Sequence, residues 1–284
     1  MMFPRSEWTI RQATPADRDD AARFLASAHR RHLHLDWSQP LELVGSAPFL
    51  IAQRGRQWLA CLACPPDPVD VAWLRLFAVA PGAPLTPSFR KLIQAVVPEV
   101  ARMGTSRISA LATRTWLRPL LEDTGFAPTN EMTFFEWDGG PLDPVGQSAI
   151  RDMLPEDLPE VQAVDERAFQ SPWQHSQKAL EQALEAAALA SVYELEGQIV
   201  GYQISTASAL GAHLARLAVE PRYQGRGIGR ELVLHALTAL GRLGLGRMTV
   251  NTQADNLPSR RLYQSLGFRE TGMRIRLYER FLHV

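Results

Sequence analysis

The chain contains an internal repeat, and this feature limits its possible folds more than any other. Three segments of the first half recur in the second half in the same order, and the first of them leads into an amphipathic helical pattern in both places. The matched segments are Ile10–Asp17 with Ile150–Asp157, Leu76–Pro81 with Arg216–Pro221, and Leu120–Phe126 with Leu262–Phe268. The repeat indicates two copies of one domain.

The length agrees with this interpretation. A chain of 284 residues is long enough for two domains of about 100–200 residues, each with its own core. The stretch from Asp138 to Gly146 is rich in Gly, Pro and Asp, which is typical of a linker. We therefore predict a first domain over residues 1–138, a linker over 139–147 and a second domain over 148–284.

The second copy has the clearer pattern of secondary structure. Period-two stretches predict strands over 149–151, 191–195, 199–206, 213–219, 247–252, 268–274 and 277–282. Helical periodicity predicts helices over 156–169, 176–190, 258–266 and from near Gly229 to Gly241 or Gly244. Strands and helices alternate, so the predicted fold class is α/β (mixed α+β), with a mixed central sheet flanked by helices in each copy.

A glycine-rich loop lies between the predicted strand ending at Val219 and the helix beginning near Gly229. Glycines at 225, 227 and 229 allow successive backbone N–H groups to converge, and the helix N-terminus adds its positive dipole end. This arrangement favours an anion, above all a phosphate. The spacing fits neither the dinucleotide fingerprint nor the P-loop, and a turn without a ligand remains the structural alternative.

Composition excludes several other classes of protein. The 30 Lys and Arg residues balance the 30 Asp and Glu residues, and the pI is about 7.1, which disfavours nucleic acid as a partner. No apolar stretch is long enough to span a membrane, and Met1–Glu7 lacks the apolar core of a signal peptide. We expect a cytoplasmic protein that does not bind membranes.

The chain has two cysteines, Cys61 and Cys64, in a C-x-x-C arrangement. The surrounding pattern predicts a strand, on which residues three apart point to opposite faces. That geometry is poor for a shared metal or a disulfide, so we expect two buried strand cysteines and no metal site.

The loop and its surroundings resemble a known family. Leu217-Ala218-Val219-x-Pro221-x-x-Gln224-Gly225-Arg226-Gly227-Ile228-Gly229, followed by Asn256 and by Leu262-Tyr263-x-x-x-Gly267-Phe268, is similar to the signature of the GNAT superfamily of acyl-CoA N-acyltransferases. The resemblance covers the whole second copy. It implies two tandem GNAT-like domains, each with a splayed sheet, and acetyl-CoA as the cosubstrate of the second.

The resemblance also implies a set of cofactor-binding residues. In the family, the fourth strand splays from the fifth, and the pantetheine arm enters the gap and pairs with the fourth strand. The pyrophosphate lies on the amides of the glycine-rich loop. The residues carried over are Leu217, Ala218, Val219, Gln224, Gly225, Arg226, Gly227, Ile228, Gly229, Arg230, Asn256 and Tyr263.

The first copy departs from this signature. After Val79 it reads Ala80-Pro81-Gly82-Ala83-Pro84-Leu85-Thr86-Pro87, in which prolines remove backbone donors from the region of the cradle. Arg114 and Leu121 stand at the positions of Asn256 and Tyr263. We therefore expect a degenerate, non-catalytic first lobe that serves as a scaffold or as a wall of the acceptor site.

Two side chains are candidates for proton transfer. Strand alternation predicts that His213 shares a face with Ala215, Leu217 and Val219, where it would act as a general base; a histidine facing solvent or core is the alternative. Tyr263 matches the family tyrosine that protonates the coenzyme A sulfur, with core packing as its alternative. These two residues are the predicted catalytic pair.

The acceptor is read less directly from the sequence. We expect a primary amine of a small molecule or a peptide, acetylated by direct attack in a ternary complex. Phe169–Trp173 resembles the branch that acetylates the N-terminal alanine of a ribosomal protein, whereas Asn251 stands where that branch has a glutamate. Tandem mycothiol synthase is a second comparison, by architecture. The alternative function is a non-catalytic CoA-binding sensor, and either a monomer or a homodimer is compatible with the sequence.

Overall fold

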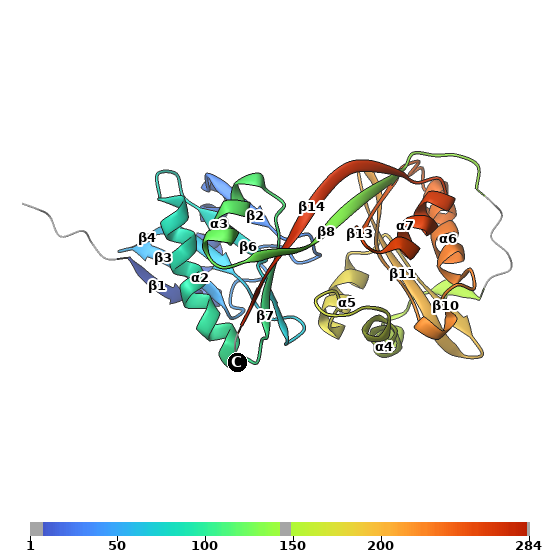
Figure 1. Cartoon of the computed structure of the whole chain (residues 1–284), viewed down its shortest axis with the longest axis horizontal. Coiled ribbons are helices and arrows are strands. Elements are labelled where there is room, and N and C mark those ends of the chain that lie inside the picture. Colours follow the sequence, from blue (N-terminus) through green and yellow to red (C-terminus); the bar gives the residue numbers. More distant parts are fainter. Residues whose placement is uncertain (1–7, 143–148, 283–284) are drawn as a thin grey trace, which may run out of the picture. The chain divides into compact units, whose positions relative to one another are not determined.

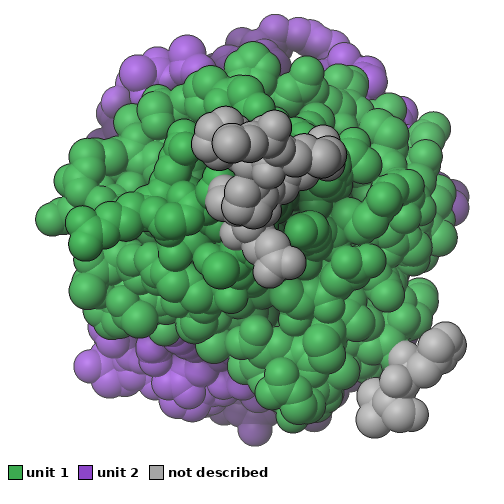
Figure 2. All heavy atoms as spheres, turned by 90° about the vertical axis from the view of Figure 1, so that its left-hand side faces the viewer, with its two compact units in different colours: residues 1–129, 275–284 green, residues 130–274 purple. Residues whose placement is uncertain are grey.

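The chain divides into two units whose boundaries each fall inside a β-strand. The computed structural model describes residues 8–142 and 149–282 (Figure 1). Unit 1 contains the residues up to Thr129 together with those from Ile275 onwards, and unit 2 contains Asn130–Arg274 (Figure 2). The mixed α/β class predicted from the sequence is confirmed.

Unit 1 is built mainly from the first copy of the repeat. Its five-stranded sheet has the order β1-β3-β4-β6-β2, and β5 and β7 belong to a second sheet. Its elements are β1 (Thr9–Gln12), η1 (Pro15–Asp17), α1 (Arg18–Ser27), β2 (Arg30–Leu33), β3 (Phe49–Arg54), β4 (Gln57–Ala63), β5 (Val71–Trp73), β6 (Leu76–Val79), α2 (Leu85–Arg102), β7 (Arg107–Leu111), η2 (Thr115–Leu117), α3 (Arg118–Asp123) and the start of β8 (Ala127–Trp137).

Unit 2 is built mainly from the second copy. Its strands follow the order β9-β10-β11-β12-β13-β8-β14. Its own elements are β9 (Ile150–Asp152), η3 (Pro155–Asp157), α4 (Leu158–Ala168), α5 (Gln177–Glu185), β10 (Leu189–Leu195), β11 (Gln198–Ser208), β12 (Gly211–Val219), η4 (Pro221–Tyr223), α6 (Ile228–Arg242), β13 (Met248–Gln253), α7 (Leu257–Ser265) and the start of β14 (Arg269–Phe281).

The two copies exchange the ends of their last strands. Residues 132–137 of β8 pair antiparallel with β13, so a strand of the first copy completes the sheet of unit 2. The second half of β14 pairs antiparallel with β7, from Leu277 beside Leu111 to Phe281 beside Arg107, so a strand of the second copy joins β5 and β7 of unit 1. All three strands belong to the nine-stranded sheet that also contains the strands of unit 2.

Because of this exchange, the structure differs from the prediction in the bounds of the two units and in the last strand of the chain. The compact units do not coincide with residues 1–138 and 148–284, because 130–138 lie in unit 2 and the chain from Ile275 lies in unit 1. The two strands expected over 268–274 and 277–282 are one strand, which runs on into unit 1 and does not turn back. Of the predicted linker, residues 139–142 have no regular structure and 143–147 lie outside the described residues.

The repeat seen in the sequence is present in the structure. Arg11 pairs with Asp17 at 2.6 Å in unit 1, and Arg151 pairs with Asp157 at 2.7 Å in unit 2. Both carboxylates also accept a backbone N–H at the start of the following helix. The hydrogen bonds from arginine lower the pKa of both aspartates below the ordinary value. This pair fixes a common reference point for comparing the two units.

Helix α6 packs on the sheet of unit 2 as its apolar periodicity predicts. The predicted core positions Leu232, Val233, Ala236, Leu237 and Leu240 are all buried. The helix approaches β11 at Gly201, where an added Cβ would lie 3.2 Å from Ile228 and 3.3 Å from Leu232. A side chain at Gly201 would therefore push α6 away from the sheet.

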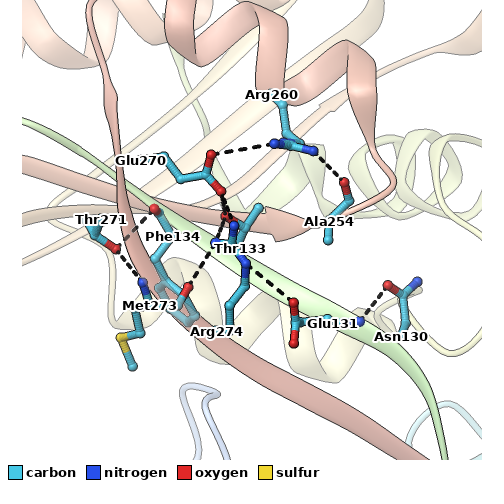
Figure 3. Close-up of polar contacts among 10 residues, drawn as sticks. All are labelled: Asn130, Glu131, Thr133, Phe134, Ala254, Arg260, Glu270, Thr271, Met273 and Arg274. Atoms are coloured by element: carbon cyan, nitrogen blue, oxygen red, sulfur yellow. Dashed lines mark hydrogen bonds and ion pairs between the residues drawn. The ribbon is translucent and has the colours of Figure 1, made fainter.

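A polar cluster fastens the exchanged strand β8 to β14 and α7 (Figure 3). Arg274 pairs with Glu270 at 2.5 Å and with Glu131 at 3.3 Å, and it donates to Thr133 Oγ1 at 2.6 Å. Arg260 of α7 contacts the same Glu270 at 3.5 Å. Hydrogen bonds from Thr133 and Arg274 lower the pKa of Glu270 below its ordinary value. The charges alternate in sign, so each arginine contacts a carboxylate from another element.

Two smaller expectations concern the cysteines and the membrane. Cys61 and Cys64 are both free and fully buried, and burial raises the pKa of both thiols, which makes them inert. Cys61 lies on β4 as predicted, whereas Cys64 follows the end of that strand at Ala63. Among the described residues, no helix has both the length and the apolarity needed to cross a bilayer.

The exchange predicts that core substitutions act across the repeat. Phe135 and Tyr278 are both fully buried. Phe135→Ala, although in the first copy, should destabilise unit 2 by about 3–5 kcal/mol, because it leaves a cavity there; Tyr278→Ala should do the same to unit 1. Hydrogen exchange resolved by peptide measures each unit separately. Faster exchange confined to unit 1 in Phe135→Ala would contradict the assignment.

Candidate active site

The sheet of unit 2 forks between β12 and β13. The two strands pair in parallel over Ala212–Leu214 and Met248–Val250. In the described chain this ladder ends there, although β12 continues to Val219 and β13 to Gln253. The backbone edge of β12 that faces away from β11 is therefore available to another extended group beyond Leu214.

A β-bulge marks the point where the fork opens. On β11, Ile204 pairs with Arg216 while its neighbour Ser205 pairs with Leu214, so Ala215 has no partner residue. An extra residue of this kind bends its strand and ends regular pairing. The bulge thus explains why β12 leaves β13 at this position. The predicted pantetheine-binding residues Leu217, Ala218 and Val219 follow it directly.

The glycine-rich loop leads from the fork into α6. Gly225 and Gly227 have φ values of +75° and +88°, and a Cβ at either would meet open space. Gly227 is the N-cap of α6 and provides no side-chain acceptor. The first N–H groups of a helix have no partner within the helix, so those of α6 are available to an anion. The side chain of Gln224 donates to Val219 O at 2.9 Å and joins the loop to the strand.

The strand edge, the loop and α7 meet around Gly229. A Cβ built on Gly229 would lie 3.4 Å from Leu262 of α7, 3.7 Å from Val219 and 4.0 Å from Leu217. The first turn of α6 therefore lies against both β12 and α7. The structure thus brings together the predicted strand edge 217–219 and the predicted cradle 224–230.

Helix α7 carries the other two predicted residues. Asn256 is its N-cap: Oδ1 accepts the N–H of Ser259 at 3.2 Å, and Nδ2 donates to Gln253 Oε1 at 3.4 Å. Tyr263 is buried between Phe135 and Phe268, at ring distances of 6.0 and 5.7 Å. Burial raises the pKa of Tyr263 above its ordinary value, so the phenol stays protonated and keeps a proton to donate.

His213 lies beside the fork, but on a different face from the one predicted. The alternation argument placed it with Leu217 and Val219; this was wrong, because the bulge at Ala215 adds a residue between them. His213 pairs with Thr206, so it lies on the face of Arg216, whose partner is Ile204. This is the face toward α4, as the bond from Arg216 to α4 shows.

The surroundings of His213 keep its imidazole neutral. Nδ1 lies 2.8 Å from Thr249 Oγ1, and the side chain also forms a hydrogen bond with Asn251. Burial lowers the pKa of His213 below its ordinary value, although hydrogen bonds with the side chain of Asn251 and the backbone of Thr249 oppose the shift. A neutral imidazole is the form that accepts a proton.

The two candidates for proton transfer lie on opposite faces of the sheet. Tyr263 packs in one apolar cluster with Leu214 and Val250. His213 and Asn251 are their strand neighbours and point to the other side. A substrate group that lies between β12 and β13, in the plane of the sheet, could therefore be approached by Tyr263 from one face and by His213 from the other.

Sequence reasoning missed a buried ion pair next to the fork. Arg216 donates from Nε to Asp165 Oδ2 at 2.8 Å, and Tyr202 donates its hydroxyl to the same carboxylate. Asp165 is completely buried, and the guanidinium of Arg216 lies 3.6 Å from the ring centroid of Phe169. On sequence alone, Asp165 belongs to the polar positions of a helix. The repeat held the signal, because its counterpart in the first copy is apolar Leu25.

Unit 1 has the same fork, but it is filled. β5 and β7 pair in parallel over three residues, Val71–Trp73 with Arg107–Ser109, as β12 and β13 do in unit 2. β2 then pairs antiparallel with the edge of β6, from Arg30 beside Val79 to Leu33 beside Leu76. The edge that is free in unit 2 is thus occupied in unit 1 by the chain itself.

Comparisons with known proteins agree with this geometry. Residues 158–268 match the model of the Acetyltransferase (GNAT) family. The [ribosomal protein bS18]-alanine N-acetyltransferase of Escherichia coli K12 is 30% identical over 122 residues, which are 43% of this chain and 81% of that protein. The mycothiol acetyltransferase of Acidothermus cellulolyticus is 42% identical over 64 residues, 22% of this chain and 19% of that protein.

A solved structure covers nearly the whole chain. The tandem GNAT protein from the clavulanic acid biosynthesis pathway aligns with 98% of this chain and 99% of its own, at a TM-score of 0.67 and 14% identity. This likeness concerns the fold. Together with the matched relative, it defines a tandem acetyltransferase architecture.

The chain belongs to the GNAT family of acetyltransferases. It is an acetyl-CoA-dependent N-acetyltransferase of the tandem type, and its second copy is similar to the ribosomal bS18 alanine acetyltransferases.

The loop geometry predicts different effects for two matched glycine substitutions. Gly227 and Gly82 have φ values of +88° and +76°, and a Cβ at either would meet open space. Alanine at either position should cost about 1–2 kcal/mol of stability through backbone strain. Gly227→Ala should also weaken coenzyme A binding by about tenfold or more, because it turns amides of the cradle away. Calorimetry and thermal unfolding measure both effects, and equal coenzyme A affinity in the two variants would contradict the assignment.

Proposed function

We propose that unit 2 transfers the acetyl group of acetyl-CoA to a primary amine by direct attack in a ternary complex. The observation that carries this proposal is the open fork in the sheet, which adjoins an uncapped helix N-terminus and has a candidate acid and a candidate base on its two faces. Acetyl-CoA, when bound, supplies an acyl group activated as a thioester.

The residues along the fork suit the different parts of this cosubstrate. Backbone N–H groups from Gly225 to Arg230 suit the pyrophosphate, since they lie at the positive end of α6. The edge of β12 at Leu217–Val219 that faces away from β11 suits the amides of the pantetheine arm, and Val219 O on this edge accepts the side chain of Gln224. Asn256 lies at the opposite wall, where its capping role fixes the side-chain amide.

In this proposal, proton transfer uses both faces of the sheet. His213 accepts the proton of the attacking amine, directly or through a water molecule. Tyr263 donates its proton to the departing sulfur, so the sulfur leaves as a thiol and the acetyl group forms a new C–N bond. The tyrosine later regains a proton from the solvent.

Unit 1 serves in this proposal as a scaffold that does not bind the cosubstrate. Strand β2 fills its fork, and Pro84 is the N-cap of α2, the helix that follows the fork strand. Leu121, the counterpart of Tyr263, is completely buried in the core of unit 1. We expect one molecule of coenzyme A per chain, and two would contradict this role.

The acceptor in this proposal is a small amine or a peptide amine. The similarity to alanine acetyltransferases of ribosomal protein bS18 favours a peptide N-terminus. One residue favours a second candidate function, a CoA-binding sensor without catalysis. Asn251 stands at the position of the glutamate in that branch, and in this structure it forms a hydrogen bond with His213.

A thiol-release assay with a panel of amines separates these functions. We expect coenzyme A to be released with at least one of the peptides, polyamines, amino sugars or amino acids tested. Tyr263→Phe should bind coenzyme A normally and react about 10²–10⁴ times more slowly, because it lacks the proton donor. Binding without release across the whole panel would favour the sensor.

The base role of His213 predicts a particular pH profile. Because burial lowers its pKa, the limb of kcat/KM that belongs to His213 should lie below pH ~6.5, where the imidazole becomes protonated, and apart from the limb at higher pH that belongs to the amine substrate. His213→Gln should lower the rate by about 10²–10⁴ and abolish this acid limb. His235→Gln is the matched control, since His235 is a partly buried histidine of α6 with a lowered pKa. An unchanged profile in His213→Gln would exclude the role.

A further inference from the structure

The loop between α4 and α5, residues 169–176, is fastened to the sheet by the buried ion pair. Arg216 Nη2 donates to Trp173 O at 2.7 Å, and the carboxylate of Asp165 accepts the N–H of His175 at 2.9 Å. Arg216 and Asp165 are themselves joined at 2.6 Å. Three residues of the sheet and α4, namely Asp165, Tyr202 and Arg216, thus form one clamp that holds the loop at Trp173 and His175.

Folding alone does not require this clamp. Replacing a buried ion pair by packed apolar groups is often neutral or stabilising, because both charges must otherwise be desolvated. Unit 1 shows this replacement. The counterpart of Asp165 is Leu25, which lies at the same distance from the repeated Arg–Asp pair. The repeat also aligns Arg216 with Leu76, and the strand registers then align Tyr202 with Cys61. All three are buried in one apolar cluster.

Unit 1 lacks the clamp, and in unit 1 the corresponding loop forms a strand that pairs with the edge of the fork. Residues 30–33 of unit 1 correspond to 170–173 of unit 2. In unit 1 this segment is β2, and its last residue, Leu33, pairs with Leu76. In unit 2 the corresponding Trp173 contacts the corresponding Arg216 through the arginine side chain. The same loop therefore has two arrangements, and they differ in whether the strand edge stays free.

A second sequence difference between the two units also disfavours pairing of the unit 2 loop with the edge of β12. Pro172 stands in unit 2 where His32 stands in the β2 ladder of unit 1. Proline has no backbone N–H and cannot donate to a ladder. His32, by contrast, is completely buried in the fork, with Nε2 3.0 Å from Leu74 O and Nδ1 3.0 Å from Thr113 Oγ1.

We propose that Asp165, Tyr202 and Arg216 are positioning residues that hold the α4–α5 loop on the α4 face of the sheet and so keep the edge of β12 open for the acyl-CoA arm. This inference rests on the proposed function of unit 2. It assigns the clamp to cosubstrate access and not to the stability of the fold.

The test converts unit 2 to the sequence of unit 1 at these positions in the full chain. The variant Asp165→Leu/Pro172→His/Tyr202→Cys/Arg216→Leu should fold, protect the amides of Leu217 and Val219 from hydrogen exchange, and bind coenzyme A about tenfold or more weakly. Pro172→His with an intact clamp is the matched control and should bind coenzyme A within about twofold of the wild type. A folded four-residue variant with wild-type affinity, or a control that loses binding, would overturn the proposal.

The outcomes separate this inference from the proposed function. If the wild type does not bind coenzyme A, the proposed function fails; if the wild type and the four-residue variant bind it equally, the clamp proposal alone fails. If that variant does not fold, Asp165→Asn replaces it, because this change keeps the side-chain size and removes the charge. Exchange at His175 should then accelerate and the coenzyme A Kd should rise by about threefold or more. Wild-type values of either quantity would overturn the clamp.

Discussion

The backbone ladder between β8 and β13 is the interaction on which the site of unit 2 depends. It runs from Met248 beside Trp137 to Gln253 beside Met132 and satisfies one edge of β13 along its whole length. The other edge can then leave β12 after Val250 without making β13 an isolated strand. The fork is thus an opening in an otherwise paired sheet. The strand that makes it possible comes from the first copy, so the second copy has an incomplete sheet by itself.

Duplication of one domain has produced two solutions to the same open edge. An unpaired edge exposes backbone donors and acceptors, and proteins usually cover it. Unit 1 covers it permanently with β2 and has apolar residues at the three positions around the loop. Among the described residues, no strand pairs with the edge of β12 beyond Leu214 in unit 2, and a buried ion pair lies beside it. The comparison within one chain distinguishes residues needed to fold from residues needed to keep a site accessible.

Local sequence signals predicted most of the elements, the repeat and the glycine-rich loop. They did not predict the strand exchange, because the pattern of β8 and β14 is the same whichever unit they join. The face of His213 was wrong because period-two alternation assumes an unbroken strand, and the bulge at Ala215 leaves no clear mark in the residue types. The buried Asp165–Arg216 pair was missed because charged residues ordinarily indicate exposed positions.

The exchange also has a consequence for how the chain acquires its structure during synthesis. Domains made on the ribosome generally fold in order from the N-terminus. Here β7 pairs with Leu277–Phe281, which are made later than all the strands from β9 to β13, while β8 already presents Phe135 and Trp137 to β13, a strand not yet made. In the nascent chain, β7 and β8 therefore lack their partner strands until β13 and β14 have been made, and during that interval their unpaired backbone groups are open to wrong pairing.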